Sequence, residues 1–504
     1  MGPCARAKSG PEFPFAQFRR GCRFCMIGVV VANRLRFTVL LFSLVVALII
    51  AGVWAAWILV GADHVRERVE VALDDALGME VQTGQPLQFG LLRGLHVTLT
   101  ELEAHREGQL VATVDSARVR ISLLNLLTGQ VRPLELHLER PEFAVERLGP
   151  GVFNVYQPET DTGQADGWSL RRLRLSDARL DYLDRGSELQ WLFEHCDADL
   201  RDLRHAGGVP EQVLATLAAV GELTCQTLTH DRLTVSDVSI EVRGESGVFE
   251  LEPISATAFE GQLAARLEAD LISDPPDFRL EGRMSQFDLG AFTPMLAQEK
   301  NASGKLDLDL ALTARGRSWQ DVRDSASGTI DMASGQLTLD GYDLDDELEG
   351  YATTQRFNLI DAGAVLLAGP VGLVASRGYA FSGLLGGDEG STRIEEMVSE
   401  WTVEAGVAEA RDVAFRTAQN RLALAGGLDF GNYSFADMRV AVIDRDGCAV
   451  VEQRISGPFR EPEIKQPNFL VTAIGPLLDL VKHGIEAVRG DECEVFYSGS
   501  IPHP

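Results

Sequence analysis

The sequence predicts a mainly β protein, in which one N-terminal transmembrane helix is followed by a long, curled antiparallel sheet with a few short helices and a C-terminal helix. Three observations predict this. An uncharged apolar stretch lies near the N-terminus, apolar and polar residues alternate over most of the following chain, and Gly, Asp, Asn and Pro turns separate the alternating segments. A period of two residues is the signal of half-buried strands, whereas a period near 3.6 indicates a helix.

The apolar stretch, residues 37–62, contains no charged residue and is long enough to cross a hydrocarbon core of about 30 Å as a helix. Residues 1–36 carry seven Lys or Arg and one acid, and such an excess marks the cytoplasmic side. We therefore expect a single-pass membrane protein with a cytoplasmic N-terminus and an exported bulk. A cleaved signal peptide is the alternative, but the run is long for one and no clear A-x-A site follows it. Translation from Met26 would keep the same topology signal.

The chain has 504 residues and a net charge of −28, and the acidic excess follows the apolar stretch. Such a surface repels nucleic acid and anionic head groups. We therefore expect no nucleic-acid partner.

After the apolar stretch, residues 65–77 place their apolar side chains on one helical face, and Gly78 is a natural helix stop. The period then changes to two, and the alternation predicts about twenty strands. The clearest of them are residues 95–99, 117–123, 134–138, 173–182, 233–242, 263–271 and 306–314.

Each of these strands has one apolar and one polar face, and an antiparallel sheet can expose one face to water but must cover the other. So many strands exceed a comfortable flat sheet and must curl. The apolar faces then line either the core of β-sandwiches or an open groove, and periodicity alone does not separate the two. Candidate lining residues are Leu95, Val97, Leu99, Leu306, Leu308 and Leu310.

Changes of composition suggest five segments. They are a cytoplasmic segment (1–36), the transmembrane anchor (37–62), an N-terminal helix with the first strands (63–160), the continuing β-groove (161–340), and a C-terminal β region with a terminal helix that starts near residue 475 (341–504).

No catalytic or cofactor motif stands out. The chain has no H-E-x-x-H, G-x-S-x-G, P-loop or dinucleotide-binding fingerprint, and the acidic run 340–349 lacks the spacing of a calcium loop. We therefore expect a protein that is not an enzyme and has no cofactor or metal. A periplasmic hydrolase would need a nucleophile–base pair that the sequence does not offer.

Several segments resemble, in their order, the AsmA family of bacterial envelope proteins. The similar stretches are the helix 69–77 with Gly78, the segment ARVRISLLNLL (117–127), the strand 134–138 with Pro141, the turn GVFN (151–154), and the later G-x-L strands near Gly261, Gly304 and Gly335. The resemblance covers roughly residues 35–460. It implies a long curled sheet with a hydrophobic groove and no catalytic residues.

The resemblance also implies a function in outer-membrane biogenesis or lipid homeostasis. On this basis we expect a protein anchored in the inner membrane, with its bulk in the periplasm, that handles or transfers phospholipid or another acyl lipid through its groove. Envelope proteins are further possible partners. The alternative is a structural or assembly factor for outer-membrane proteins that adds strands of its clients to the edge of its sheet.

Four cysteines follow the apolar stretch, and an even number in an oxidising space allows two bridges with three connectivities. Cys448 and Cys493 lie in stretches similar to the tail of an AsmA subgroup, and each begins a strand-like segment on either side of the predicted C-terminal helix. We therefore predict a bridge between Cys448 and Cys493. Nothing in the sequence places Cys196 near Cys225.

Overall fold

The computed structural model describes residues 79–84, 88–90, 96–121, 133–149, 152–155, 165–186, 189–208, 216–296, 302–341, 343–346, 348, 390–459, 461–466, 468–469 and 493–504. The predicted transmembrane stretch, the helix after it, Leu95 and the C-terminal helix lie outside these residues. Among the helices of the described part, none is long and apolar enough to cross a membrane. The chain divides into two compact units, Met1–Val69 and Glu70–Pro504, and all described residues belong to the second.

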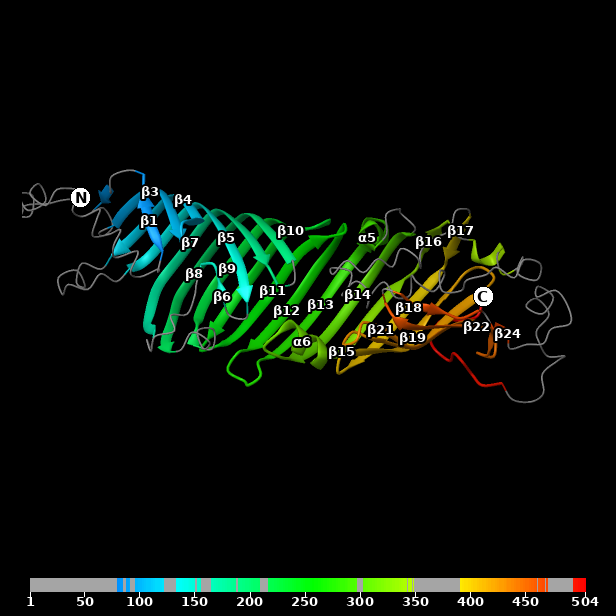
Figure 1. Cartoon of the computed structure of the whole chain (residues 1–504). Coiled ribbons are helices and arrows are strands. Elements are labelled where there is room, and N and C mark those ends of the chain that lie inside the picture. The colour runs from blue at the N-terminus through cyan, green and yellow to red at the C-terminus, as the bar shows by residue number, and fades with distance from the viewer. Residues whose placement is uncertain are drawn as a thin grey trace, which may run out of the picture. The chain divides into compact units, whose positions relative to one another are not determined.

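The described residues of this second unit form one sheet of twenty-four strands, which succeed one another side by side in chain order over most of it (Figure 1). The first half contains β1 (Glu80–Thr83), β2 (Gln88–Gly90), β3 (His96–Arg106), β4 (Gln109–Ile121), β5 (Pro133–Gly149), β6 (Val152–Phe153), β7 (Ala165–Asp184), β8 (Leu189–Gly208), β9 (Ala218–His230), β10 (Leu233–Glu245), β11 (Val248–Ala258) and β12 (Gly261–Asp270).

The second half contains β13 (Asp277–Asp288), α5 (Leu289–Leu296), β14 (Ala302–Arg315), α6 (Trp319–Ser325), β15 (Ser327–Ser334), β16 (Leu337–Asp340), β17 (Ser391–Ile394), β18 (Glu396–Glu404), β19 (Val407–Arg416), β20 (Arg421–Asp429), β21 (Ser434–Ile443), β22 (Ala449–Pro458), β23 (Glu463–Ile464) and β24 (Asn468–Phe469). The mainly β, antiparallel-dominated fold expected from the alternation is thus present in the described residues, with few helices.

One strand pair corrects the expectation of a purely antiparallel sheet, because β5 and β7 run parallel. After β5 the chain turns back through β6, a two-residue strand that pairs antiparallel with the end of β5. The Asn154 side chain fixes this turn, since it accepts from the Glu146 N–H at 2.7 Å and donates to the Ala144 carbonyl at 2.9 Å. β7 then pairs with β5 from near the start of that strand, where Glu135 lies opposite Arg172.

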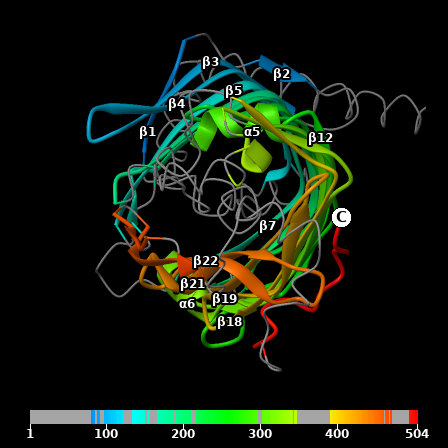
Figure 2. The ribbon, with the colours of Figure 1, turned by 90° about the vertical axis from the view of Figure 1, so that its right-hand side faces the viewer.

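Bulges in the middle of the strands explain why the sheet curls. Eight non-glycine residues of the described strands adopt φ between 45° and 58° and are left out of the pairing register: Glu101, Arg140, Asp177, His195, Asp202, Asp237, Gln286 and Asp437. A bulge bends its strand and increases the local twist. Repeated on strand after strand, it lets the strands of this unit follow one another around a common axis, as Figure 2 shows.

The largest core lies between β13 and β22. Trp401, Phe415 and Leu422 are fully buried there, and α5 contributes Leu289 and Phe292. Phe292 packs edge-to-face with Phe259 and close to Phe287, with ring centroids 5.2–5.3 Å apart. In this part of the molecule the apolar face of the sheet is therefore an ordinary protein interior.

The apolar face of the sheet as a candidate functional site

The register places the apolar positions of successive strands in continuous rows on one side of the sheet, which we call the apolar face. Val97 of β3 lies opposite Val119 of β4, which lies opposite Leu136 of β5. The row continues through the parallel pair to Leu173 of β7 and Leu200 of β8. A second row runs beside it, through Leu99, Ala117, Leu138, Leu175 and Ala198.

The rows extend through the middle of the sheet without a change of side. Leu251 of β11 is followed by Leu267, Leu280 and Leu312 on the next three strands. Bulges do not break the pattern. On both sides of each extra residue, the apolar residues of the strand still point to the apolar face. An elongated apolar surface thus crosses β3–β14.

The predicted lining residues in the described part all lie on this face. Val97, Leu99 and Leu306 are buried, whereas Leu308 and Leu310 are half-buried. The intervening Asp307 and Asp309 lie on the opposite face, which we call the polar face. There Asp309 accepts a hydrogen bond from Arg283 Nε at 2.6 Å, and Asp307 accepts from the Gln286 N–H at 2.9 Å.

The cover over the apolar face differs along the sheet. On β5–β14 most of the large apolar side chains are only half-buried, including Leu138, Leu175, Leu267, Leu280 and Leu310. From β15 to β22 the corresponding side chains are almost completely removed from solvent, with exposures of 5% or less for Ile330, Trp401, Phe415, Leu422 and Val442. The half-buried stretch is therefore the part of the face that leaves apolar surface exposed to solvent.

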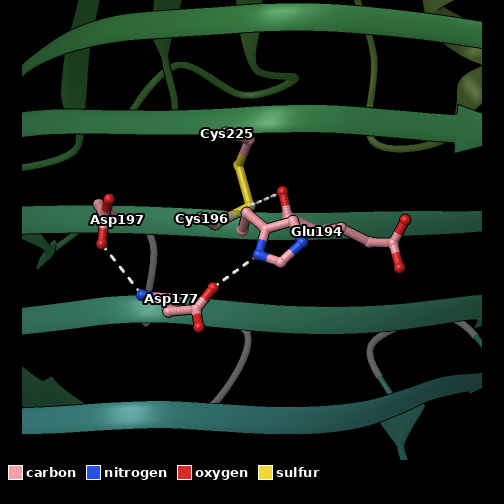
Figure 3. Close-up of a disulfide and its surroundings, with 6 residues drawn as sticks. Asp177, Glu194, Cys196, Asp197 and Cys225 are labelled. Carbon is pink, nitrogen blue, oxygen red and sulfur yellow. Dashed lines mark hydrogen bonds and ion pairs between the residues drawn. A yellow bond between two sulfur atoms is a disulfide. The ribbon is translucent and has the colours of Figure 1, made fainter.

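A disulfide between Cys196 and Cys225 lies on the apolar face of β8 and β9 (Figure 3). The two residues are direct partners in the register, and a row of small residues, Ala178, Val238 and Ala256, packs with them. Sequence reasoning missed this pair, although each cysteine occupies an apolar position of its strand. The sequence signal for this pair was that both cysteines fall on the apolar side of the alternation.

The bulge beside this disulfide is held by two aspartates (Figure 3). The extra residue leaves the Asp177 N–H without a ladder partner, and the Asp197 carboxylate accepts it at 3.0 Å. The Asp177 carboxylate in turn contacts His195 Nδ1 at 2.7 Å. These polar contacts lie on the side of the sheet away from the sulfurs, so they satisfy the bulge without interrupting the apolar rows.

The second disulfide joins Cys448 to Cys493, the pair predicted from the sequence. It leads into residues 493–504, which we call the tail. The N–H groups of Phe496 and Tyr497 donate to the Gly447 carbonyl at 2.8 and 3.0 Å. Tyr497 and Ile501 then pack on Ala414, Ala423 and Ala441, which point to the polar face of the C-terminal strands.

The tail is also fixed by polar contacts. The Tyr497 hydroxyl donates to Asp412 Oδ1 at 2.6 Å, and the Ser500 N–H donates to Asp412 Oδ2 at 2.8 Å. Burial and the Asp412 carboxylate both raise the pKa of Tyr497, so the phenol keeps its proton and remains a donor. Arg421 Nη1 donates to the Ile501 carbonyl at 3.0 Å. Both faces of the sheet are therefore covered here.

Within the described residues, no group of three or more His, Cys, Asp or Glu side chains is arranged to hold a metal ion.

The family model of the AsmA family matches residues 196–411, from β8 to β19. This match supports AsmA-family membership and confirms the resemblance over the middle of the chain. It suggests an envelope-related function. No curated protein and no solved structure gives a significant match to the chain.

Proposed function

From the AsmA-family membership that this match supports, we propose that the protein handles acyl lipid in the cell envelope by holding lipid chains against the apolar face of β3–β14. The observation that carries the proposal is the continuous row of half-buried positions on this stretch, most of them leucines, including Leu138 on β5 and Leu310 on β14. A continuous apolar surface suits an acyl chain, because each CH₂ removed from water contributes about 0.8 kcal/mol and no polar recognition is required.

In this proposal the protein is not an enzyme, and its ligand is a phospholipid or a related acyl lipid. Residues 37–62 anchor it in the inner membrane with the N-terminus in the cytoplasm, so that the sheet works in the periplasm. Lipid that leaves one membrane can then move along the apolar face toward the outer membrane, where it supports outer-membrane biogenesis.

The alternative function, edge-to-edge assembly of outer-membrane proteins, has weaker support. Each long terminal strand of the sheet already carries two short partners, β1 and β2 on β3, and β23 and β24 on β22. Short strands at an edge are a common way of preventing further pairing.

Site-specific photo-cross-linking tests the proposal. A photoreactive residue at Leu280, on the apolar face, is compared with one at Glu281, its exposed neighbour on the polar face. The full chain is irradiated in its native membrane, extracted in detergent and analysed by mass spectrometry. We expect a lipid adduct at position 280 and none at position 281. Equal labelling of the two positions, or none at either, would refute lipid binding on this face.

A further inference from the structure

A cavity of about 290 Å³ opens on the polar face of β3, β4, β5 and β7. Two neighbouring rows of the register supply its walls. One row runs through His96, Arg120, Glu135 and Arg172, and the other through Arg118, His137 and Arg174. The full lining is His96, Arg118, Arg120, Glu135, Leu136, His137, Arg172 and Arg174. The parallel pairing of β5 with β7 is what brings these four arginines together.

The acids near this cavity are fewer than the arginines. Arg120 pairs with Glu135 at 2.8 Å. Asp199, beside the cavity on β8, is shared among Arg172, which holds it through two hydrogen bonds, Arg174 at 3.5 Å and Arg201 at 3.9 Å. Among the described residues no carboxylate lies within ion-pair distance of Arg118. Cross-strand pairing alone would not need this surplus of positive charge.

His137 lies between the two arginine rows, and its Nε2 is 3.1 Å from the Ser176 hydroxyl. Burial lowers the pKa of His137, and the nearby Arg118 and Arg174 lower it further against the opposing effect of Glu139. The imidazole is therefore neutral at neutral pH and offers a hydrogen bond instead of another charge.

At other places on the polar face, single arginines are surrounded by several carboxylates. Arg266 of β12 contacts three carboxylates, those of Glu250, Glu252 and Glu268. Arg416 of β19 contacts Glu395 and Glu396. In a chain with a net charge of −28, this cavity is a local reversal of sign. The repulsion of anions expected from the overall charge therefore does not extend to it.

We propose that this cavity is a binding site for a phosphate group, held by the guanidinium groups of Arg118 and Arg174 with Arg120 and Arg172 behind them. A guanidinium donates two parallel hydrogen bonds to phosphate oxygens. Arg118 gains this contact without giving up a carboxylate partner, and Arg174 is held by Asp199 only at 3.5 Å, a carboxylate that it shares with Arg172 and Arg201. The group arrives either on a lipid head group, as a phosphodiester, or as free phosphate. The site lies on the face opposite the proposed lipid-chain surface and does not depend on it.

Titration calorimetry of the full chain in a non-ionic detergent tests this site. Two probes without acyl chains separate the sources: glycerophosphoglycerol, the head group of phosphatidylglycerol, and inorganic phosphate. The test variant is R118Q/R174Q, since both side chains are exposed and the Arg172–Asp199 pair is left intact. R118Q alone serves as a milder variant. The matched control is R243Q/R279Q, two exposed arginines of the polar face outside the cavity.

We expect the wild type and R243Q/R279Q to bind at least one probe equally well, and R118Q/R174Q to bind it at least about tenfold more weakly. Binding of the diester identifies a lipid head group as the source, whereas binding of inorganic phosphate alone identifies free phosphate. The proposal is overturned if neither probe binds the wild type, or if R118Q/R174Q and R118Q bind as well as the control. Because neither probe has an acyl chain, this failure would leave the lipid-chain proposal untouched.

Discussion

The N-terminal region of the sheet, β3–β14, and the C-terminal region, β15–β22 with the tail, show the same alternation of residues. They differ in how far their side chains are buried. In the N-terminal region the polar-face positions carry charged residues such as Arg174 and Glu281, and most of the leucines on the apolar face are half-buried. In the C-terminal region the polar-face positions include Ala414, Ala423 and Ala441, and the tail covers them. The comparison shows that alternation identifies a strand. The residues on the polar face indicate whether that face is also buried.

The largest expected effect separates the two regions by stability. Trp401→Ala removes a fully buried ring and its hydrogen bond to Ser399 Oγ, and should lower the free energy of unfolding by about 3–5 kcal/mol. Leu267→Ala, on the half-buried part of the face, should cost only about 1 kcal/mol. Urea unfolding of the full chain followed by circular dichroism measures both. Equal losses would mean that the two regions are packed alike.

The next effect tests the boundary between the regions, which lies within β14. Leu308→Asp places a carboxylate on the apolar face against the main core and should cost about 2–4 kcal/mol. Asp307→Asn and Asp309→Asn, on the polar face, should change stability by at most about 1 kcal/mol. The same unfolding assay compares them. Similar tolerance at positions 307 and 308 would place the register one residue out.

Each disulfide stabilises one region, and removing it should make only that region more accessible to protease. In the chain-entropy account, bridges that close loops of 45 and 29 residues each contribute about 4 kcal/mol, and measured values are commonly 2–4 kcal/mol. Limited proteolysis should cut the tail of C448S/C493S but not that of C196S/C225S. Free alkylation of Cys448 in unreduced protein would contradict the tail bridge.

The smallest effect concerns the polar contacts of the tail. Asp412→Asn weakens the acceptor of the Tyr497 hydroxyl and the Ser500 N–H, and should cost about 1 kcal/mol. Hydrogen exchange should show faster exchange at residues 497–501 and no change on β8 and β9. Asp331→Asn is the control, because its partner Arg411 is exposed and 3.4 Å away. An equal response to both changes would mean that Asp412 does not hold the tail.

Local alternation was sufficient to predict several of the strands and their approximate number. The segments expected at 263–271 and 306–314 correspond to β12 and β14, and Asp307 and Asp309 lie opposite the leucines of β14 as the period of two requires. The pairing of Cys448 with Cys493 was also anticipated, because the two residues flank one predicted element.

Features that depend on which strands become neighbours could not be predicted. Cys196 and Cys225 lie opposite each other because of the register in which β8 pairs with β9. The phosphate-site candidates Arg118 and Arg174 are far apart in sequence and meet through the parallel pairing of β5 and β7, which alternation does not reveal. The net charge of the whole chain is negative, and a net charge does not reveal a local cluster of arginines.

The Cys196–Cys225 disulfide has a mechanical consequence for a sheet built from strands stacked in chain order. Tension applied at the two ends of such a chain peels strands from the edges one at a time. In this geometry the hydrogen bonds between strands break one after another, so the sheet resists little force. When the force reaches Cys196 it passes through the sulfurs to Cys225, and the 29-residue loop between them carries no load. Roughly 100 Å of contour length, at about 3.4 Å per residue, is thereby withheld from extension. The bridge should appear in single-molecule stretching as a shortened unfolding step that lengthens when reductant is added.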